Sequence, residues 1–231
     1  MINNWSIFNH TPSNCFLCGQ GVRLEQLFCQ NCSDTLPYLH NSCLSCANPL
    51  SGSGGLVCGK CQQKSPPVDR TISVFRYENP ISHVIQQYKF HERIFLAGWL
   101  AGFLIERIKC EYERLPDLIT PVPLHPKRLR QRGFNQALEL AKVISKQLSI
   151  QHAPQLCQRI KNTAPQVELP GPERHKNLRG VFQTSKPLNG KHIALIDDVM
   201  TTGSTLNEIA KTLKKAGASR VDAWVIARTS K

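Results

Sequence analysis

The feature that most limits the possible folds of this chain is the stretch HIALIDDVMTTGSTL, residues 192–206. Its four apolar residues at 193–196 run directly into two adjacent acids, Asp197 and Asp198. An uninterrupted apolar run of this length is typical of a strand that is buried on both faces, as in a parallel sheet. The sequence therefore predicts a strand at 193–196 with two carboxylates at its C-terminal end.

A loop rich in hydroxyl groups follows the two acids, and a helix is predicted behind it. Thr205 and Glu208 have the spacing of a capping box, in which the helix begins at the threonine. Loop amides, hydroxyl groups and the helix N-terminus would then meet at one point, which suits a phosphate group. The two acids beside it can accept hydrogen bonds from sugar hydroxyls or hold a metal ion through water. The predicted phosphate-binding residues are Thr201, Thr202, Gly203, Ser204 and Thr205.

Eight of the ten cysteines form four CxxC pairs before residue 62, and the last two pairs repeat the spacing of the first two to within one residue. Two CxxC turns supply four thiolates, which is the ligand set of a structural zinc site. Disulfides are the alternative, but a reducing compartment disfavours them. We predict two structural Zn²⁺ ions, with sequential pairing favoured over a cross-braced arrangement. The ligands would be Cys15, Cys18, Cys29 and Cys32 for one ion and Cys43, Cys46, Cys58 and Cys61 for the other.

The formal net charge of +13 is concentrated behind the cysteine pairs. Residues 1–68 hold three basic and two acidic side chains, so the remainder carries a net charge of +12. Such a field attracts polyphosphates and nucleic acids without specifying which. No apolar stretch reaches the length of a membrane span, and residues 1–15 lack the pattern of a secretory signal. We expect a cytoplasmic protein with no membrane span.

Residues 62–67, QQKSPP, are polar and end in a stiff Pro-Pro pair, which is typical of a linker. We predict a small double zinc-ribbon domain, with four cysteines to each zinc, over residues 1–66 and a larger domain over residues 67–231. Strand patterns alternate with helical periodicity in the larger domain, which favours an α/β fold with a parallel sheet. Strands are predicted at 71–77, 118–122, 193–196 and 221–227, helices from about 81, at 134–148 and at 205–216, and a long apolar segment at 94–108.

A basic loop is predicted at residues 123–133, directly after the strand at 118–122. Ligands of parallel α/β sheets bind at the carboxyl ends of the strands, so this loop and the two acids should lie at the same edge. A flexible basic loop there would neutralise a diphosphate, with or without Mg²⁺. The rival interpretation is that these residues bind a nucleic-acid backbone, and one loop could do both. The third interpretation is a run of charged residues that only faces solvent. The basic residues are Lys127, Arg128, Arg130 and Arg132.

Taken together, these motifs resemble one family. Residues 192–206 match the signature with which type I phosphoribosyltransferases bind phosphoribosyl pyrophosphate (PRPP). The cysteine pairs, YKF at 88–90, RGFNQ at 132–136 and the segment at 159–182 are similar to ComF-like proteins, also called ComFC or GntX-like, of the phosphoribosyltransferase superfamily. The resemblance covers essentially the whole chain.

The resemblance implies a type I phosphoribosyltransferase-like core and a role in DNA uptake during natural transformation. It implies that Asp197 and Asp198 contact the ribose hydroxyls as the catalytic acids and that residues 201–205 wrap the 5-phosphate. It also makes Arg128, Arg130 and Arg132 candidates for contacting the pyrophosphate, with Mg²⁺. Gln166 and Arg174 lie where this superfamily carries a mobile hood, and are candidates for closing over the substrate.

Three functions are compatible with the sequence. The first is a phosphoribosyltransferase that acts on an unidentified acceptor. The second is a protein that senses PRPP or a 5-phosphate end without turnover, and the third is a single-stranded DNA-handling factor that has reused the site. The intact acid pair and loop favour ligand binding. The expected partners are PRPP or a related ribose 5-phosphate ligand, single-stranded DNA, and competence or DNA-uptake proteins.

Overall fold

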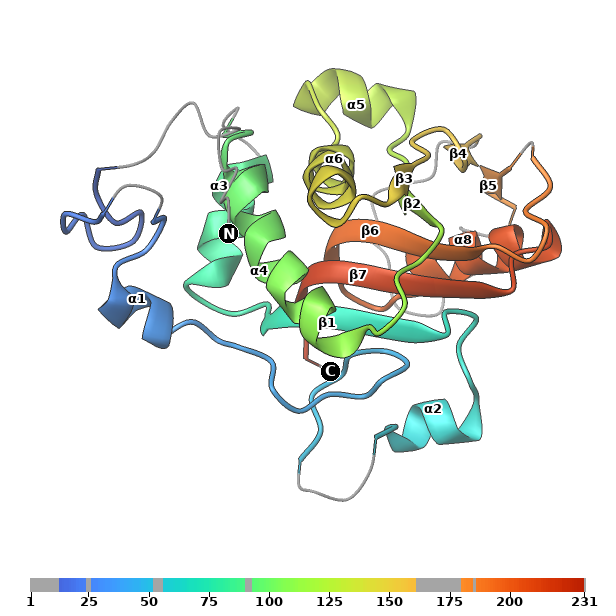
Figure 1. The fold of residues 1–231 in the computed structure, drawn as a ribbon, viewed down its shortest axis with the longest axis horizontal. Helices are drawn as coiled ribbons and strands as arrows, with labels where there is room; N and C mark the ends of the chain where they lie inside the picture. Colours follow the sequence, from blue (N-terminus) through green and yellow to red (C-terminus); the bar gives the residue numbers. More distant parts are fainter. Residues whose placement is uncertain are drawn as a thin grey trace.

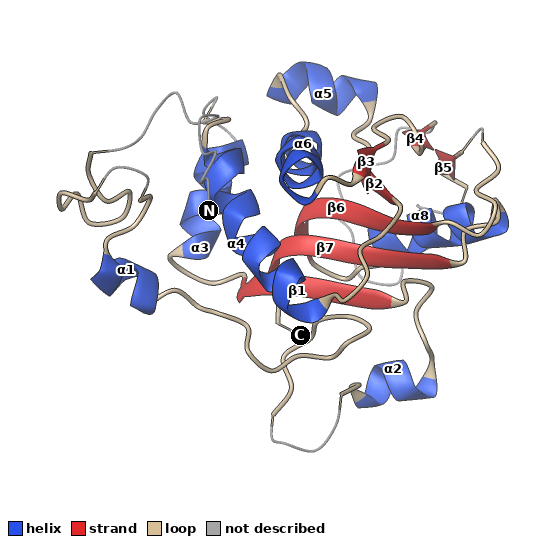
Figure 2. Cartoon of the chain, viewed as in Figure 1, coloured by secondary structure: helices blue, strands red, loops and turns tan. Residues whose placement is uncertain are grey.

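The computed structural model describes residues 13–23, 26–51, 56–89, 93–160, 180–184 and 186–230, and Figures 1 and 2 show its secondary structure. The helices are α1 (Gln30–Asp34), α2 (Gly59–Gln63), α3 (Ile81–Lys89), α4 (Leu96–Glu111), α5 (Pro126–Arg132), α6 (Gln136–Leu148) and α8 (Ser204–Lys215). The strands are β1 (Arg70–Arg76), β2 (Leu118–Pro121), β3 (Gln151–His152), β4 (Gln158–Arg159), β5 (Phe182–Gln183), β6 (His192–Met200) and β7 (Arg220–Arg228). Among the helices of this part of the chain, none is long and apolar enough to cross a lipid bilayer.

Five strands of the described residues form one parallel sheet in the order β1-β7-β6-β2-β3. β6 lies inside this sheet, between β7 and β2, and its residues 193–196 are fully buried. An apolar run takes this place because helices cover both faces of a parallel sheet, so the side chains on either face of an inner strand are excluded from water. The predicted α/β fold with a parallel sheet is confirmed.

Successive residues of β6 face two different helical layers. Ala194 and Ile196 belong to the apolar cluster that contains α4 and α6, whereas Ile193 and Leu195 pack in the cluster that contains α8. Side chains alternate along a strand, so α4 and α6 cover one face of the sheet and α8 the other, as Figure 1 shows. The apolar face that α8 turns toward the sheet consists of Leu206, Ile209, Ala210 and Leu213.

The cysteine-rich segment packs against the edge of the sheet at β1. The amide of Leu39 donates to the carbonyl of Val74 (2.8 Å), and the amide of Arg76 donates to the carbonyl of Pro37 (2.8 Å). The ring of Tyr38 lies 5.0 Å from that of Phe75. These contacts cover an edge strand that would otherwise expose unpaired backbone groups. The domain boundary at residues 66/67 stays a prediction, and the two sides of it are in direct contact.

A network of polar side chains lies where β6 and β7 begin. Asp222 is fully buried, and its Oδ2 lies 2.8 Å from Nε2 of His192. Arg220 donates from Nε to Oδ1 of the same carboxylate (3.0 Å). The hydroxyl of Tyr112 also donates to Asp222 and accepts from the indole N–H of Trp224 (3.1 Å). Burial raises the pKa of Asp222, but these hydrogen bonds lower that pKa more, so the carboxylate is charged.

The basic segment predicted as a loop contains a helix. Residues 126–132 form α5, which Gly133 follows with a φ of +79°. Two features explain the helix: a proline suits its first position, and lysine, arginine, leucine and glutamine are good helix formers. The expectation of a flexible loop over 123–133 was wrong for this part, because a high density of charge is compatible with a solvated helix as well as with a loop.

Two local predictions around the acid pair were also wrong. β6 does not end before the acids but continues to Met200, because β7 pairs with it as far as Arg228. α8 begins at Ser204 rather than at Thr205, with Gly203 as its N-cap. The capping box is absent at this described helix start, since the carboxylate of Glu208 accepts a hydrogen bond from the amide of Gly180 (3.1 Å) instead.

Candidate functional site

The segment between β6 and α8 is a tight loop around a small hollow. The hollow has a volume of about 60 Å³, and it is lined by Asp197, Val199, Met200, Thr201, Gly203, Ser204, Thr205 and Leu206. The hydroxyls of Thr202 and Ser204 lie 2.7 Å apart, and the amide of Ser204 donates to Oγ1 of Thr202 (3.3 Å). The first turn of a helix has N–H groups without intrahelical acceptors, which attract anions. The loop therefore has the chemistry of a phosphate site.

Gly203 is required by the shape of this loop. Its φ is +75°, a left-handed conformation that side chains with a Cβ disfavour. A Cβ at this position would also lie 2.4 Å from the terminal methyl of Met200. The glycine lets the backbone turn sharply from the end of the strand into α8, which places the first turn of that helix against the hollow.

The two acids of β6 have different surroundings. Asp198 is 8% exposed, its Oδ1 accepts from the amide of Val199 (2.7 Å), and its Oδ2 lies 2.9 Å from Nζ of Lys89. Asp197 lines the hollow of the phosphate loop, and its Oδ1 accepts from the amide of Asp198 (3.0 Å). The structure therefore places Asp197 at the loop and Asp198 in an ion pair with Lys89.

The charges of Asp197, Asp198 and Lys89 depend on one another. Burial, with the neighbouring carboxylate of Asp198 as the second cause, raises the pKa of Asp197 to about 8. Burial lowers the pKa of Lys89, but the carboxylate of Asp198 raises that pKa more, so the ammonium is charged. Within the described residues, Lys89 is the one cation in direct contact with these two adjacent acids. The site therefore favours an added hydrogen-bond donor or positive charge at Asp197.

Lys89 is the site residue that the sequence did not reveal. It is the last residue of α3, and Tyr88 before it donates from its hydroxyl to the carbonyl of Gln136 (2.8 Å). Gln136 in turn donates from Nε2 to the carbonyl of Lys89 (3.5 Å). The motifs YKF and RGFNQ thus meet in space and hold the lysine in place. The YKF motif was the available signal, but nothing in it pointed to a partner on β6.

The predicted arginines lie on α5, after β2. Arg130 is exposed, whereas Arg132 donates from Nη1 to Oε1 of Gln136 (3.3 Å). Residues two apart on a helix face different directions, so these two guanidinium groups do not converge on one ligand group in this conformation. Arg128 belongs to the same helix. The hood candidates Gln166 and Arg174 lie outside the described residues.

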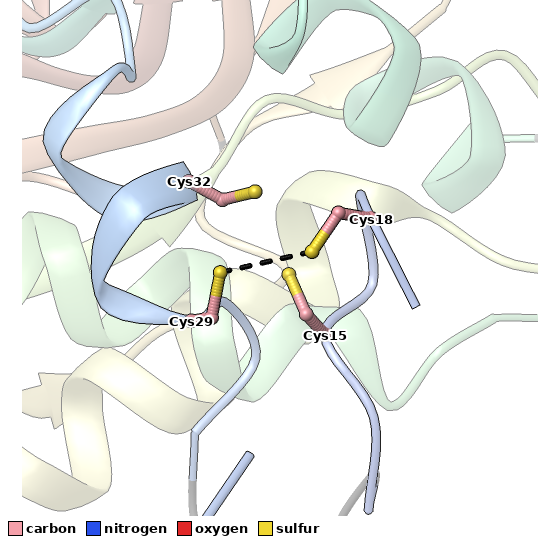
Figure 3. Close-up of side chains that lie close together, drawn as sticks. All are labelled: Cys15, Cys18, Cys29 and Cys32. Atoms are coloured by element: carbon pink, nitrogen blue, oxygen red, sulfur yellow. Dashed lines mark hydrogen bonds between the residues drawn. The ribbon is translucent and has the colours of Figure 1, made fainter. Parts of the chain in front are cut away.

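The cysteines form two separate groups of four. Within the described residues, the sulfur atoms of each group lie within 4.8 Å of one another, and the two groups are Cys15, Cys18, Cys29 and Cys32, and Cys43, Cys46, Cys58 and Cys61. Figure 3 shows the side chains of the first group pointing toward a common centre. Sequential pairing is confirmed, and the cross-braced arrangement is excluded for these residues.

The spacing of the sulfur atoms fits zinc. Sγ of Cys18 and Sγ of Cys29 lie 3.7 Å apart, and Sγ of Cys46 and Sγ of Cys58 lie 3.8 Å apart. Bonds of about 2.3 Å in a tetrahedral arrangement place two sulfur ligands about 3.8 Å apart. Both groups are therefore structural zinc sites of the four-cysteine type, and four protein ligands leave no open position for catalysis.

Comparison with known proteins finds two domain families in the chain. Residues 10–62 match the double zinc ribbon domain, and residues 135–231 match the phosphoribosyl transferase domain. Among solved structures, a purine phosphoribosyltransferase from Pyrococcus horikoshii Ot3 is 20% identical and covers 56% of this chain and 70% of its own, with a TM-score of 0.34. That likeness is distant, so the assignment of a family depends on closer relatives.

Such relatives span the chain. DNA utilization protein YhgH of Escherichia coli K12 is 36% identical over 94% of this chain and 98% of its own length. Competence protein F of Haemophilus influenzae is 35% identical over 74% of this chain and 78% of its own length. Competence protein ComFC of Streptococcus pneumoniae is 26% identical over 93% of this chain and 99% of its own length. The chain therefore belongs to the ComF family, and it joins an N-terminal double zinc ribbon to a phosphoribosyltransferase-like domain.

Proposed function

We propose that this protein binds PRPP, or a related ribose 5-phosphate ligand, together with Mg²⁺, and that it handles single-stranded DNA during DNA uptake in the cytoplasm. One observation carries the ligand: the hollow at the end of β6 joins an acid, loop hydroxyls and the first turn of α8 in one place. In this proposal the 5-phosphate lies in the loop of residues 201–205, and Asp197 and Asp198 face the ribose hydroxyls.

The electrostatics of the site support a sugar beside the acid pair. Burial and the repulsion of Asp198 disfavour the charged form of Asp197, as its raised pKa shows. A ribose hydroxyl that donates a hydrogen bond to Asp197 would stabilise that charged form. Mg²⁺ would arrive with the diphosphate, since phosphate oxygens are its usual ligands. The basic helix α5 supplies further positive charge for the diphosphate once its arginines reorient.

Calorimetry tests the ligand. The zinc-loaded protein is titrated with PRPP in the presence and absence of Mg²⁺, and we expect a single site per chain that needs Mg²⁺. The double variant Asp197→Asn, Asp198→Asn should lose binding. Glu106→Gln is the matched control, because this acid lies on the exposed side of α4 and should leave the affinity unchanged. Equal PRPP affinity in the wild type and the double variant would contradict the proposed site.

The charge distribution supports contact with DNA. A groove of about 1100 Å³ between the linker, β5 and α8 is lined by Lys64, Lys211 and Lys215, and it adjoins the phosphate loop through Ser204. Glu208 also lines it and pairs with Lys211 (3.5 Å), but the lysines outnumber this acid. The names of the relatives, a DNA utilization protein and competence proteins, point in the same direction.

Fluorescence anisotropy with a labelled oligonucleotide tests the DNA proposal. Affinity should fall steeply with salt, and Lys211→Ala with Lys215→Ala should weaken it and lower the salt slope by about two. The triple variant Arg128→Ala, Arg130→Ala, Arg132→Ala should weaken it as well. Lys109→Ala, on the exposed side of α4, is the matched control. Unchanged affinity in both sets of variants would contradict DNA contact at these surfaces.

One observation favours binding without turnover as a second candidate. Lys89 already neutralises Asp198, so less negative charge is available to stabilise a cationic sugar in a transfer reaction. Pyrophosphate release with a panel of amines, bases and oligonucleotides separates the two functions. Release with any acceptor establishes a phosphoribosyltransferase, and binding of PRPP with no release across the panel establishes a sensor.

A further inference from the structure

Arg228, the last residue of β7, is a buried arginine with an unusual set of partners. Only 3% of it is exposed, and in the part of the chain that the structure describes it forms no ion pair with a carboxylate. Its guanidinium contacts backbone carbonyls instead. Nε donates to the carbonyl of Cys46 (2.8 Å), and Nη1 donates to those of Met200 (3.2 Å), Thr201 and Thr229 (2.6 Å). One side chain therefore joins segments that lie far apart in the sequence.

On one side, Arg228 holds a zinc knuckle. Three successive carbonyls of the turn between Cys43 and Cys46 accept hydrogen bonds from the sheet. The amide of Thr71 donates to Leu44 (2.7 Å), the hydroxyl of Thr71 donates to Ser45 (2.8 Å), and Arg228 donates to Cys46. The shape of this turn is set by its two thiolates, because both are ligands of the second zinc site.

On the other side, Arg228 holds the start of the phosphate loop. Met200 ends β6, and Thr201 is the first residue of the loop. The amide of Thr229 also donates to the carbonyl of Met200 (3.1 Å), so the guanidinium and the backbone after it hold the same point. Met200 lies against Gly203, where the chain turns into α8. A shift of Arg228 would therefore change the place where the loop leaves the sheet.

We infer that Arg228 is a positioning residue that couples the second zinc site to the phosphate loop. When Cys43, Cys46, Cys58 and Cys61 hold zinc, the carbonyl of Cys46 fixes Nε of Arg228, and the same guanidinium fixes the loop carbonyls of Met200 and Thr201. Loss of zinc from this site frees the knuckle and loosens the loop. The consequence for ligand affinity rests on the proposed binding of PRPP, whereas the coupling itself does not.

The first zinc site provides the control. Its apolar neighbour Phe28 packs on Phe103 of α4, with ring centroids 6.2 Å apart, and the hydrogen bonds of Arg228 do not involve it. Three variants separate the two sites: Arg228→Lys keeps the charge but lacks the planar fork that reaches both segments, Cys58→Ser removes a ligand of the second site, and Cys18→Ser removes a ligand of the first. Circular dichroism establishes that each variant is folded, and zinc content establishes how many ions it holds.

Hydrogen exchange of the amides at residues 201–205 tests the coupling without any ligand. We expect faster exchange at these amides in Arg228→Lys and in Cys58→Ser, and an unchanged rate in Cys18→Ser. A uniform increase over the whole sheet in Arg228→Lys would show a general loss of stability and would overturn a positioning role. Unchanged loop exchange in Arg228→Lys would also overturn it, and this variant decides the matter if Cys58→Ser fails to fold.

PRPP affinity, measured by calorimetry with Mg²⁺, tests the consequence. Arg228→Lys and Cys58→Ser should bind PRPP about 5- to 150-fold more weakly, the usual range for coupling between two sites, and Cys18→Ser should bind like the wild type. Equal weakening in all three variants would assign the effect to overall stability and contradict the coupling. If the wild type itself binds no PRPP, the proposed ligand is wrong, and loop exchange still decides whether the zinc site and the loop are coupled.

Discussion

Asp197 has a carboxyl group whose surroundings disfavour its charged form. Burial and the adjacent Asp198 raise its pKa to about 8, against about 3.9 for an exposed aspartate. Between about pH 4 and pH 8 the folded protein therefore retains a proton that the unfolded chain has released. Stability falls as the pH rises through this window, because the folded state binds more protons there.

Asp197→Asn removes this ionisable group while keeping the shape of the side chain. We expect the variant to be more stable than the wild type, with a difference that grows between pH 5 and pH 8 to about 1–3 kcal/mol. Urea unfolding at several pH values measures the difference. A difference in unfolding free energy that does not change with pH would contradict the raised pKa.

Lys89 is the cation that compensates the negative charge of the acid pair. Lys89→Met keeps the aliphatic packing but leaves Asp198 without its 2.9 Å partner. We expect a loss of about 1–3 kcal/mol, the cost of an unpaired group of this burial, and partial recovery in the double variant Lys89→Met, Asp198→Asn. Lys109→Met, an exposed lysine on α4, is the control. A double variant as unstable as the sum of the single ones would show that the ion pair is not the cause.

At the scale of the secondary-structure elements, polar side chains gather at both ends of the parallel strands, and the two groups have different roles. The phosphate loop lies at the end of β6, and the buried network around Asp222 lies at the start of β7, where no part of the candidate site is found among the described residues. Ligands of parallel sheets bind at the carboxyl ends of the strands. The Asp222 network therefore stabilises the sheet rather than a ligand.

Asp222→Asn tests this assignment. It removes the charge that His192 and Arg220 contact, so we expect the free energy of unfolding to fall by about 2–4 kcal/mol. The zinc content should stay at two ions per chain, and the affinity for PRPP should not change once the variant is folded. A variant of normal stability with weakened ligand binding would reverse the assignment.

The sequence predicted an element well where the pattern that defines it lies within the element itself. The start of β6 and both ends of α6 and β7 were predicted within two residues. Burial on both faces of a strand leaves an uninterrupted apolar run, and burial on one face of a helix leaves a helical period. α5 was missed because its residues favour a helix and yet carry charges that are also typical of loops. The strand character of the two acids was missed because it depends on pairing with β7, which follows more than twenty residues later in the chain.

In the candidate site, too, local features were predictable from the sequence and long-range contacts were not. The phosphate loop and the cysteine ligands are contiguous or regularly spaced, so their residue types and spacing could be interpreted from the sequence. The roles of Lys89 and Arg228 could not be predicted, because each side chain contacts a segment more than a hundred residues away along the chain. Contacts of this kind become visible only when the sheet and the helices are assembled.

For the molecule as a whole, the zinc sites hold together a front segment with few large apolar residues. Metal binding supplies folding energy where a core cannot. Chelation should therefore raise hydrogen exchange over residues 13–61 and lower the melting temperature, while the amides of β6 and β7 stay protected. Restoring Zn²⁺ should reverse both changes. Unchanged exchange in the cysteine-rich segment after the loss of both ions would contradict a structural role for the metal.

The central claim is that the loop after β6 holds the 5-phosphate of a ribose whose hydroxyls face the acid pair. A crystal structure of the zinc-loaded protein soaked with PRPP and Mg²⁺ tests it most directly. We predict phosphate oxygens within hydrogen-bond distance of the amides and hydroxyls of residues 201–205, with the ribose against Asp197 and Asp198. An empty loop at saturating PRPP, or PRPP bound at another surface of the protein, would contradict the account.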